Sequence, residues 1–400
     1  MQRRTLLQGL MQGSLATLGL LSGTRLFAAP ATSSRLLLVF LRGGYDAASL
    51  LVPLNSEFYQ STRPTIGIAR PDAGNPNSAI QLDANWGLHP ALRDTIVPLW
   101  QQRQAAFIAF AGTPDTTRSH FETQDSIEAG LGAASMGPVT SGFLNRLTQV
   151  LGGSAISFTD ALPTIFKGEQ AVANISLKGV GKPTFDARQA QVLAGMYQGH
   201  RLDTSVREGL DLRQQVAREF EQEMQAASRG AISAKGFDAE ARRIARLMRE
   251  RYQIGFVDIG GWDTHVNQGG ALGALANNLA DLGRGLAGFA QEMGPMWRQT
   301  TVVVVSEFGR TLRENGTRGT DHGHGSVYWV LGGGLGQAGG TVAGEQVAVE
   351  ARTLFQNRDY PVLNDYRAVL AGLFQRLYGL SNADLERVFE GVRPKDIGLA

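Results

Sequence analysis

The stretch from Thr300 to Val305 reads Thr-Thr-Val-Val-Val-Val, a run of six uncharged, β-branched residues. Such a run is typical of a strand that is buried on both faces in the middle of a sheet. A long helical pattern at about 271–293 precedes it, and a polar, glycine-rich stretch follows it. This order of helix, buried strand and polar loop predicts an α/β domain with a mostly parallel sheet.

The same alternation extends outward over most of the chain. Four more segments are short and apolar enough to be strands, at 35–41, 105–111, 254–257 and 327–331. Helical patterns lie at about 94–102, 120–129, 142–151, 239–252, 365–378 and 382–389. We therefore expect a single α/β domain at residues 32–400, with helices on both faces of the sheet. An irregular and then polar, helical stretch at about 152–235 predicts an insertion or cap, with an exposed helix at 207–227.

The first residues have the layout of an export signal. The pair Arg3-Arg4 is followed at once by apolar residues, and no acidic residue occurs before Asp46. A weakly apolar, glycine-containing stretch and a run of small residues complete the pattern. An arginine pair in this position is typical of the twin-arginine route, so residues 1–31 predict passage through the twin-arginine translocase to the periplasm. The apolar stretch is too short to span a bilayer, and we expect no integral membrane segment in the mature chain.

Composition excludes several kinds of site. The chain has no cysteine, so it can form neither disulfides nor a thiolate metal site. Loss of residues 1–31 removes three arginines and no acid, which changes the formal net charge from +2 to about −1. Without a basic cluster with interleaved aromatics, no nucleic-acid partner is expected. The glycine motif at 334–339 matches a dinucleotide fingerprint but leads into no helix, so no nucleotide cofactor is expected.

Polar residues are concentrated directly after the predicted strands. In an open parallel sheet the carboxyl ends of the strands meet at one edge, where ligands bind. Four of the six histidines fall in these segments, namely His120, His265, His322 and His324. Each of them alone could be a hydrogen-bonded loop residue, but their clustering favours a functional site.

Aspartates accompany these histidines. Asp-x-His occurs at Asp263/His265, and Asp321 is followed by His322 and His324. Aspartate and neutral imidazole together favour zinc, manganese or a similar divalent ion. A bound metal ion and a purely hydrogen-bonded role both remain open for this set.

Arginines lie at the same edges. Arg42, Arg118 and Arg310 each follow a predicted strand. Guanidinium groups suit a phosphate or sulfate group because they form paired hydrogen bonds with its oxygens. Salt bridges to neighbouring carboxylates are an equally open interpretation for each of them.

Two hydroxyl groups stand close to His120. Thr116 and Ser119 could act as nucleophiles if a metal ion or this histidine activated them. Ser119 could instead cap the helix that begins near Phe121, with Glu122 as the returning carboxylate.

Five ordered motifs point to a known family. They are FLRGGYDAASLLVP (40–53), GTPDTTRSHFETQDSIEAG (112–130), GGWDTHVNQ (260–268), SEFGRTLRENG (306–316) and GTDHGHGSV (319–327). After an arginine-pair leader, this set closely resembles a bacterial family, the domain-of-unknown-function family numbered 1501, over nearly the whole mature chain. That family is similar to a distant branch of the alkaline phosphatase and sulfatase superfamily. The resemblance implies an alkaline-phosphatase-like α/β fold with a one- or two-metal site at the strand ends.

The resemblance also suggests roles for individual residues. Asp263 and His265 lie where the superfamily has an Asp/His metal-binding segment, and His324 lies where it has its last histidine ligand before a strand. Thr116 or Ser119 falls near the nucleophile segment.

Two positions depart from the superfamily pattern. Gly43 stands where a metal-binding aspartate is usual, with Asp46 displaced, and Glu307-Phe308 replaces an Asp-His pair. Either the site is rebuilt with a different set of ligands, or the two-metal chemistry is absent. The residues available for rebuilding are Asp46, Glu307, Asp321 and His322.

Two functional hypotheses follow. The first is a metal-dependent periplasmic hydrolase of phosphate or sulfate esters, with an anionic ester as its substrate. In it Thr116 or Ser119 attacks the ester, and His120 moves protons. The second is a non-catalytic periplasmic binding or assembly protein that retains the phosphatase-like fold, in which the motif residues hold loops together or recognise a partner.

Overall fold

A computed structural model describes residues 34–132, 139–177, 187–211 and 236–399 of the chain. The export signal predicted at 1–31 lies outside the described residues, and so do 178–186 and 212–235 of the predicted insertion. In the described ranges, no helix is long and apolar enough to cross a membrane.

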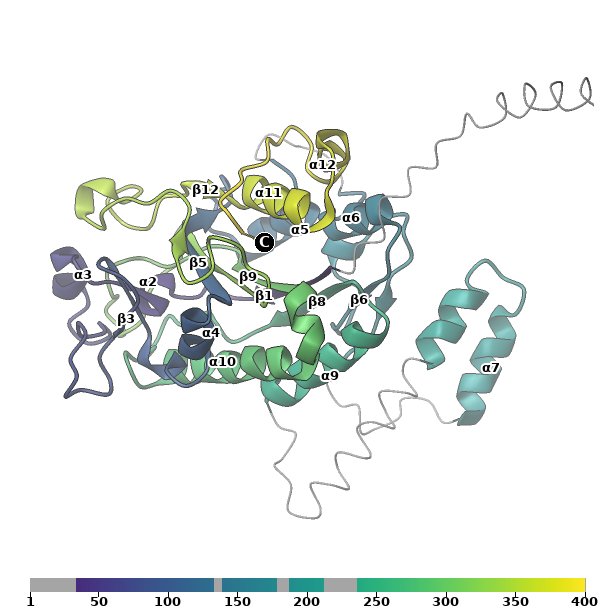
Figure 1. Cartoon of the computed structure of the whole chain (residues 1–400), viewed down its shortest axis with the longest axis horizontal. Helices are drawn as coiled ribbons and strands as arrows, with labels where there is room; N and C mark the ends of the chain where they lie inside the picture. The colour runs from purple at the N-terminus through teal and green to yellow at the C-terminus, as the bar shows by residue number, and fades with distance from the viewer. Residues whose placement is uncertain (1–33, 133–138, 178–186, 212–235, 400) are drawn as a thin grey trace, which may run out of the picture. The chain divides into compact units, whose positions relative to one another are not determined.

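A mixed sheet lies between two groups of helices (Figure 1). Within the described residues its order is β11-β5-β10-β9-β1-β8-β6-β7, and β12 pairs with β5. The strands are β1 (Arg35–Leu41), β5 (Ala105–Gly112), β6 (Ala155–Ser157), β7 (Ala173–Asn174), β8 (Ile254–Ile259), β9 (Thr300–Ser306), β10 (Ser326–Gly332), β11 (Val342–Ala343) and β12 (Asn364–Asp365). Only β10 runs antiparallel to its neighbours among these described strands. The predicted mostly parallel α/β sheet is confirmed.

Strand β1 occupies the centre of this sheet between β8 and β9. Alternate side chains of a strand point to opposite faces, so Leu37 and Val39 join one apolar core and Leu36 and Leu38 join the other. Both cores are buried, which explains why the sequence of β1 is apolar at almost every position instead of alternating.

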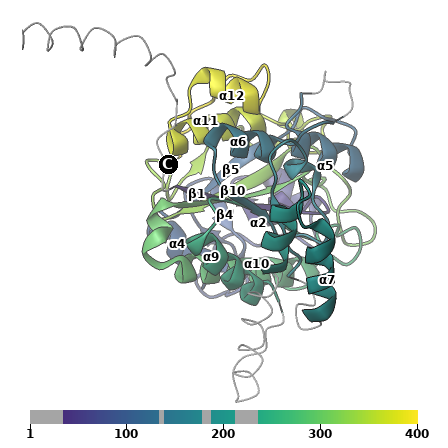
Figure 2. The same cartoon turned by 90° about the vertical axis from the view of Figure 1, so that its right-hand side faces the viewer.

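Helices cover both faces of the sheet, as the two views show (Figures 1 and 2). One core contains residues of α4 (Ile96–Gln101), α9 (Phe237–Glu250) and α10 (Ala274–Met293). The other contains residues of α5 (His120–Ala129), α6 (Phe143–Leu151), α11 (Tyr366–Tyr378) and α12 (Asn382–Val388). The predicted two-sided arrangement is therefore present.

Shorter elements complete the described chain. A small sheet has the order β2-β4-β3, formed by Leu51–Pro53, Trp86–Leu88 and Ile80–Gln81. The short helices are α2 (Ala47–Leu50), α3 (Glu57–Thr62), η1 (Pro90–Leu92), η2 (Thr164–Phe166), η3 (Gly294–Gln299) and η4 (Ala351–Thr353). The predicted insertion at 152–235 includes β6 and β7 of the main sheet and helix α7 (Ala187–Tyr197), so its limits stay a prediction.

The strand ends that matter for function share one edge. β8 and β9 pair with β1 in parallel, and β5 has the same direction as β9 because both are antiparallel to β10. The loops after β1, β5, β8 and β9 therefore leave the sheet at the same side, where the polar motifs of the sequence follow them.

Candidate functional site

Three side chains from three different loops meet at this edge. His120 is the first residue of α5 after β5, Asp263 follows β8, and His322 lies between β9 and β10. One ligand atom from each residue lies within 4.8 Å of the ligand atoms of the other two. We call these three residues the strand-end cluster.

His265 lies beside the strand-end cluster. Its Nε2 is 2.9 Å from Asp263 Oδ1 and 3.0 Å from His322 Nε2. Its side chain is 38% exposed, whereas those of His120 and His322 are 24% and 25% exposed. The His265 side chain is therefore more accessible to solvent than those of the other two histidines.

Glu307 holds His120 in place. The buried carboxylate accepts from His120 Nδ1 at 2.8 Å, Gln124 Nε2 at 2.8 Å, Gly43 N at 2.8 Å and Ser306 Oγ at 2.9 Å. Burial alone would raise the pKa of Glu307, but the hydrogen bonds from His120 and Gln124 outweigh it, so this pKa is lowered. Glu307 is thus ionised and fixes a proton on His120 Nδ1.

The opposite nitrogen of His120 faces the cluster. Its Nε2 is buried, has no hydrogen bond to any described residue, and lies 3.6 Å from Asp263 Oδ2. The hydrogen bond to Glu307 raises the pKa of His120. Since the Nδ1 proton is held by a carboxylate, Nε2 of the neutral ring carries the free lone pair and is available as a ligand.

The other two histidines are oriented in the same way. Nδ1 of His322 lies 3.0 Å from the carbonyl oxygen of Arg118, and Nδ1 of His265 lies 3.4 Å from Asp321 Oδ1. Asn315 donates both to Asp321 and to the backbone of His265, at 3.0 Å each, which connects this pair. All three histidines therefore direct Nδ1 to an acceptor and Nε2 toward Asp263.

Arg310 favours the ionised form of Asp263. Its side chain is fully buried, forms an ion pair with Asp263 Oδ1, and lies 3.4 Å from His265 Nε2. Burial opposes ionisation of Asp263, but the hydrogen bond and charge of Arg310 more than offset it, so the Asp263 pKa is lowered. Burial first, and then the charges of Arg310 and His120, lower the pKa of His322. Asp263 is thus anionic and His322 neutral near pH 7.

Two residues predicted as metal ligands lie apart from the strand-end cluster. Asp46 is buried against Arg63, with 2.5 Å between its Oδ2 and Arg63 Nη1, and it also accepts from Ser49 and Gln268. Its oxygens are therefore used within the core. The ring of His324 lies 4.8 Å from that of Phe355, and its buried side chain belongs to neither the cluster nor its hydrogen bonds.

The predicted anion-binding arginines all contact carboxylates. Arg42 pairs with Glu128 at 2.6 Å and with Asp258 at 3.2 Å. Arg118 pairs with the buried Asp359 at 3.0 Å. Together with the Arg310–Asp263 pair, these contacts correspond to the salt-bridge interpretation that the sequence left open.

The two predicted nucleophiles precede the cluster on the loop before α5. Ser119 is the N-cap of this helix, and its Oγ accepts from Glu122 N at 3.5 Å. Thr116 is exposed on the same loop. The capping interpretation of Ser119 is therefore realised, and Thr116 keeps a free approach from solvent.

Sequence reasoning missed two residues that support the site, Gln124 and Asn315, and it noted Phe308 only as a departure from the superfamily pattern. Gln124 bonds Glu307, Asn315 bonds Asp321, and the Phe308 ring lies 4.9 Å from the rings of both His120 and His322. Gln124 follows His120 by four residues on one helix, a spacing that places both on the same face and could have indicated it. Asn315 and Phe308 had no such local signal.

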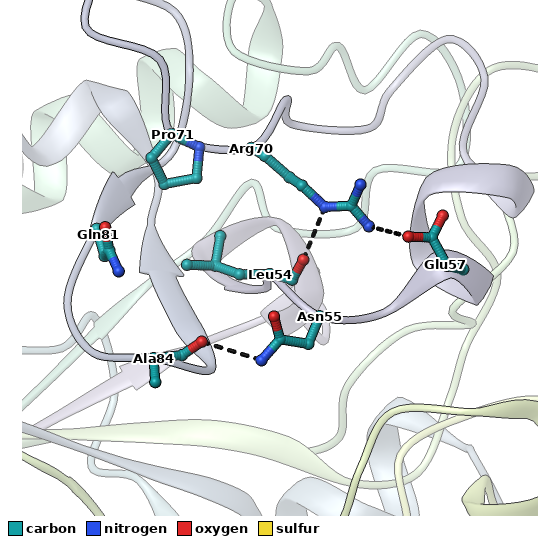
Figure 3. A pocket seen from close by; sticks show the side chains of 7 residues that line it. All are labelled: Leu54, Asn55, Glu57, Arg70, Pro71, Gln81 and Ala84. Carbon is teal, nitrogen blue, oxygen red and sulfur yellow. Dashed lines mark hydrogen bonds and ion pairs between the residues drawn. The ribbon is translucent and has the colours of Figure 1, made fainter.

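A separate shallow cavity of about 400 Å³ lies near the small sheet (Figure 3). Arg70 donates to the Leu54 carbonyl oxygen and pairs with Glu57 at 2.5 Å, and Asn55 donates to the Ala84 carbonyl oxygen. The Arg70 and Glu57 side chains are exposed, and the cavity is lined by none of the predicted site residues.

The model of the family described as "Protein of unknown function (DUF1501)" matches residues 33–392. The chain belongs to the DUF1501 family. No curated protein matches its sequence.

Solved structures of low sequence identity are similar to this DUF1501 chain. An alkaline phosphatase superfamily protein from Vibrio parahaemolyticus is 11% identical, with a TM-score of 0.34, over 76% of this chain and 64% of that one. Lipoteichoic acid synthase LtaP from Listeria monocytogenes is 10% identical, with a TM-score of 0.40, over 93% and 77%. The PsFucS1 sulfatase from Pseudoalteromonas sp. is 11% identical, with a TM-score of 0.36, over 77% and 64%. At these scores the similarity assigns no activity to the chain.

Proposed function

We propose that this DUF1501 protein is an exported, metal-dependent hydrolase of phosphate or sulfate esters. One observation carries the proposal: His120, His265 and His322 all direct Nδ1 to an acceptor and Nε2 toward Asp263. Hydrogen bonds of this kind fix the tautomer and ring orientation of metal-binding histidines. Three such rings around one carboxylate favour a metal site over loop packing.

The strand-end cluster would hold the ion. His120, Asp263 and His322 offer two imidazole nitrogens and one carboxylate oxygen, a donor set that suits zinc or manganese. The buried His120 Nε2, which has no other partner among the described residues, fits this role. Three protein ligands leave a coordination position open, as in catalytic sites. A divalent ion bound there would polarise the ester and lower the pKa of a bound water.

His265 is the residue that we assign to proton movement. Hydrolysis breaks the bond between phosphorus or sulfur and the leaving oxygen, and water supplies a hydroxyl group to the former and a proton to the latter. His265 is partly exposed, and Asp321 accepts at its Nδ1, so its Nε2 can take or give that proton. This exchanges the roles that the sequence suggested for His120 and His265.

A non-catalytic binding or assembly role has one observation in its favour. The three arginines expected to hold an anionic group, Arg42, Arg118 and Arg310, all pair with carboxylates of the chain. In the enzymatic hypothesis the bound ion must therefore attract the anion. The two functions differ in ester hydrolysis: the enzyme would hydrolyse an ester with the ion bound, and the binding or assembly protein would not.

Localisation forms part of the proposal. The arginine pair at the start of the chain and the segment up to residue 31 support export by the twin-arginine translocase to the periplasm. That route carries folded proteins, which would allow an ion to be bound before export.

The test combines metal analysis with a panel of phosphate and sulfate esters. We expect the purified exported protein to contain zinc or manganese and to hydrolyse at least one ester class. His322→Ala should lower ion affinity and turnover at least about 100-fold. His200→Ala is the matched control, because His200 is exposed and outside the cluster. Turnover that is absent, or equal in both variants, would refute the proposal.

A further inference from the structure

A permanent positive charge lies where three strand ends meet. The buried Arg310 donates to the carbonyl oxygen of Gly43 at 2.6 Å, to that of Thr320 at 3.0 Å, to that of Gly44, and to the Asp263 carboxylate. These acceptors belong to the loops after β1, β8 and β9. Since a guanidinium group is not deprotonated in proteins, the charge stays fixed beside Asp263 Oδ1.

The end of β1 has no room for an additional ligand. Gly43 has φ +124°, and a Cβ atom on it would lie 2.5 Å from Asp263 N. Gly44 has φ +61°, and a Cβ atom on it would collide with the Phe308 ring. A carboxylate therefore fits at neither position. β1 contributes only two carbonyl oxygens here, and both accept from Arg310.

The end of β9 offers no free ligand either. Phe308 packs its ring against His120 and His322, with centroids 4.9 Å apart in each case, and it has no lone pair for a metal. The neighbouring Glu307 already accepts from four donors of the chain. Neither departure from the superfamily pattern thus supplies a free ligand for a further ion.

We propose that the Arg310 guanidinium takes the place of a second cation, so that this site binds one divalent ion and not two. The inference rests on the proposed metal site and deepens it. Asp263 is the shared group: its Oδ1 pairs with Arg310 and also lies 2.9 Å from His265 Nε2 and 3.4 Å from His322 Nε2, while its Oδ2 faces His120. A second dication would have to share this carboxylate with the first ion and with a fixed guanidinium, and the repulsion between these cations disfavours it. Arg310 is a positioning residue because it acts through Asp263.

Ion counting tests this proposal directly. The full-length exported protein is stripped with a chelator, titrated with Zn²⁺ or Mn²⁺ in a calorimeter, and analysed for bound metal by mass spectrometry. We expect one ion per chain. Arg310→Lys keeps the charge and should keep one ion, with affinity within about 10-fold of wild type, whereas Arg310→Met should lose about 10- to 100-fold because Asp263 loses its orientation.

Another buried arginine, Arg63, supplies the control. Arg63 also pairs with a buried aspartate, so Arg63→Lys carries a similar risk to folding but should leave ion number and affinity unchanged. Two ions per wild-type chain would overturn this inference and leave the hydrolase proposal standing. No bound ion would overturn both. Arg310→Met binding with wild-type affinity would also overturn it, and if that variant does not fold, the wild-type count and Arg310→Lys decide.

Discussion

Arg63 and Arg310 are both fully buried and each pairs with an aspartate, and the two pairs have different surroundings. Asp46 and Arg63 are 1% and 0% exposed, and the remaining partners of Asp46 are Ser49 and Gln268. Asp263 is 47% exposed, although its partner Arg310 is 0% exposed. The first pair is closed to solvent and to ligands, whereas in the second both carboxylate oxygens face histidines: Oδ2 lies 3.6 Å from His120 Nε2, and Oδ1 lies 2.9 Å from His265 Nε2.

Burial of the cation alone therefore does not make a ligand-binding site. Backbone carbonyl oxygens fix both guanidinium groups. Those of Leu312 and Thr311 accept from Arg63, and those of Gly43 and Thr320 accept from Arg310. The two pairs differ in whether the carboxylate still has an oxygen that a ligand can reach. Asp46 has used its oxygens on the core, so we expect it to matter for stability, and Asp263 for ligand binding.

Removing the charge of Asp46 should have the largest effect among the changes that test this comparison. Asp46→Asn leaves Arg63 buried without its counter-ion, which should cost about 3–5 kcal/mol in free energy of unfolding. Urea unfolding at pH 7 measures it. Burial alone would raise the Asp46 pKa, but Arg63 lowers it below 3.8, so this stabilisation is present above pH 3.8 and is lost as pH falls through the folded-state pKa. The variant should lack that acid-dependent loss, and a change below about 1 kcal/mol would contradict the closed-pair description.

The corresponding change at the Asp263–Arg310 pair should lower ion affinity more than it lowers stability. Asp263→Asn should lower Zn²⁺ or Mn²⁺ affinity at least about 100-fold, because the only carboxylate of the strand-end cluster is lost. Its stability should fall by only about 1–2 kcal/mol, since water can replace a partner that is nearly half exposed. Calorimetric titration and urea unfolding of one preparation give both numbers. Equal losses of stability in Asp46→Asn and Asp263→Asn would remove the distinction.

A smaller effect on ion binding is expected from a change of Glu307, the carboxylate that accepts from His120. Glu307→Gln should weaken ion binding about 10-fold, because the ring loses the carboxylate that orients it. The bond to Glu307 raises the His120 pKa, so in the variant this pKa falls and protons compete with the ion only at lower pH. The midpoint of the acid loss of binding should therefore move down. Glu128 is a buried carboxylate that pairs with Arg42, so Glu128→Gln should leave this midpoint unchanged.

The main strands were predictable because their signal is local. Each of the five predicted strands is present, as β1, β5, β8, β9 and β10, since apolar runs such as 300–305 reflect burial on both faces. Strands β6, β7, β11 and β12 were not predicted. They are only two or three residues long, too short for a periodic pattern.

The site was predictable in its location but not in its membership. The edge followed from parallel strands, and His120, Asp263 and His322 were among the candidates. Their grouping was hidden, because His322 and His324 are two residues apart and only the first reaches the cluster. Whether a loop residue points inward depends on the turn that carries it, here the bridge between Arg310 and His322.

Hydrophobic pattern and the order of motifs are sufficient to predict the layered α/β architecture, the family and the edge at which polar residues gather. Which aspartate is closed to ligands and which is open depends on the packing of segments that are far apart in the chain. Asp46 and Asp263 both follow strands, but Arg63 lies 17 residues after the first and Arg310 lies 47 residues after the second. Packing of distant segments, not local sequence, thus decided which carboxylate remained available to a ligand.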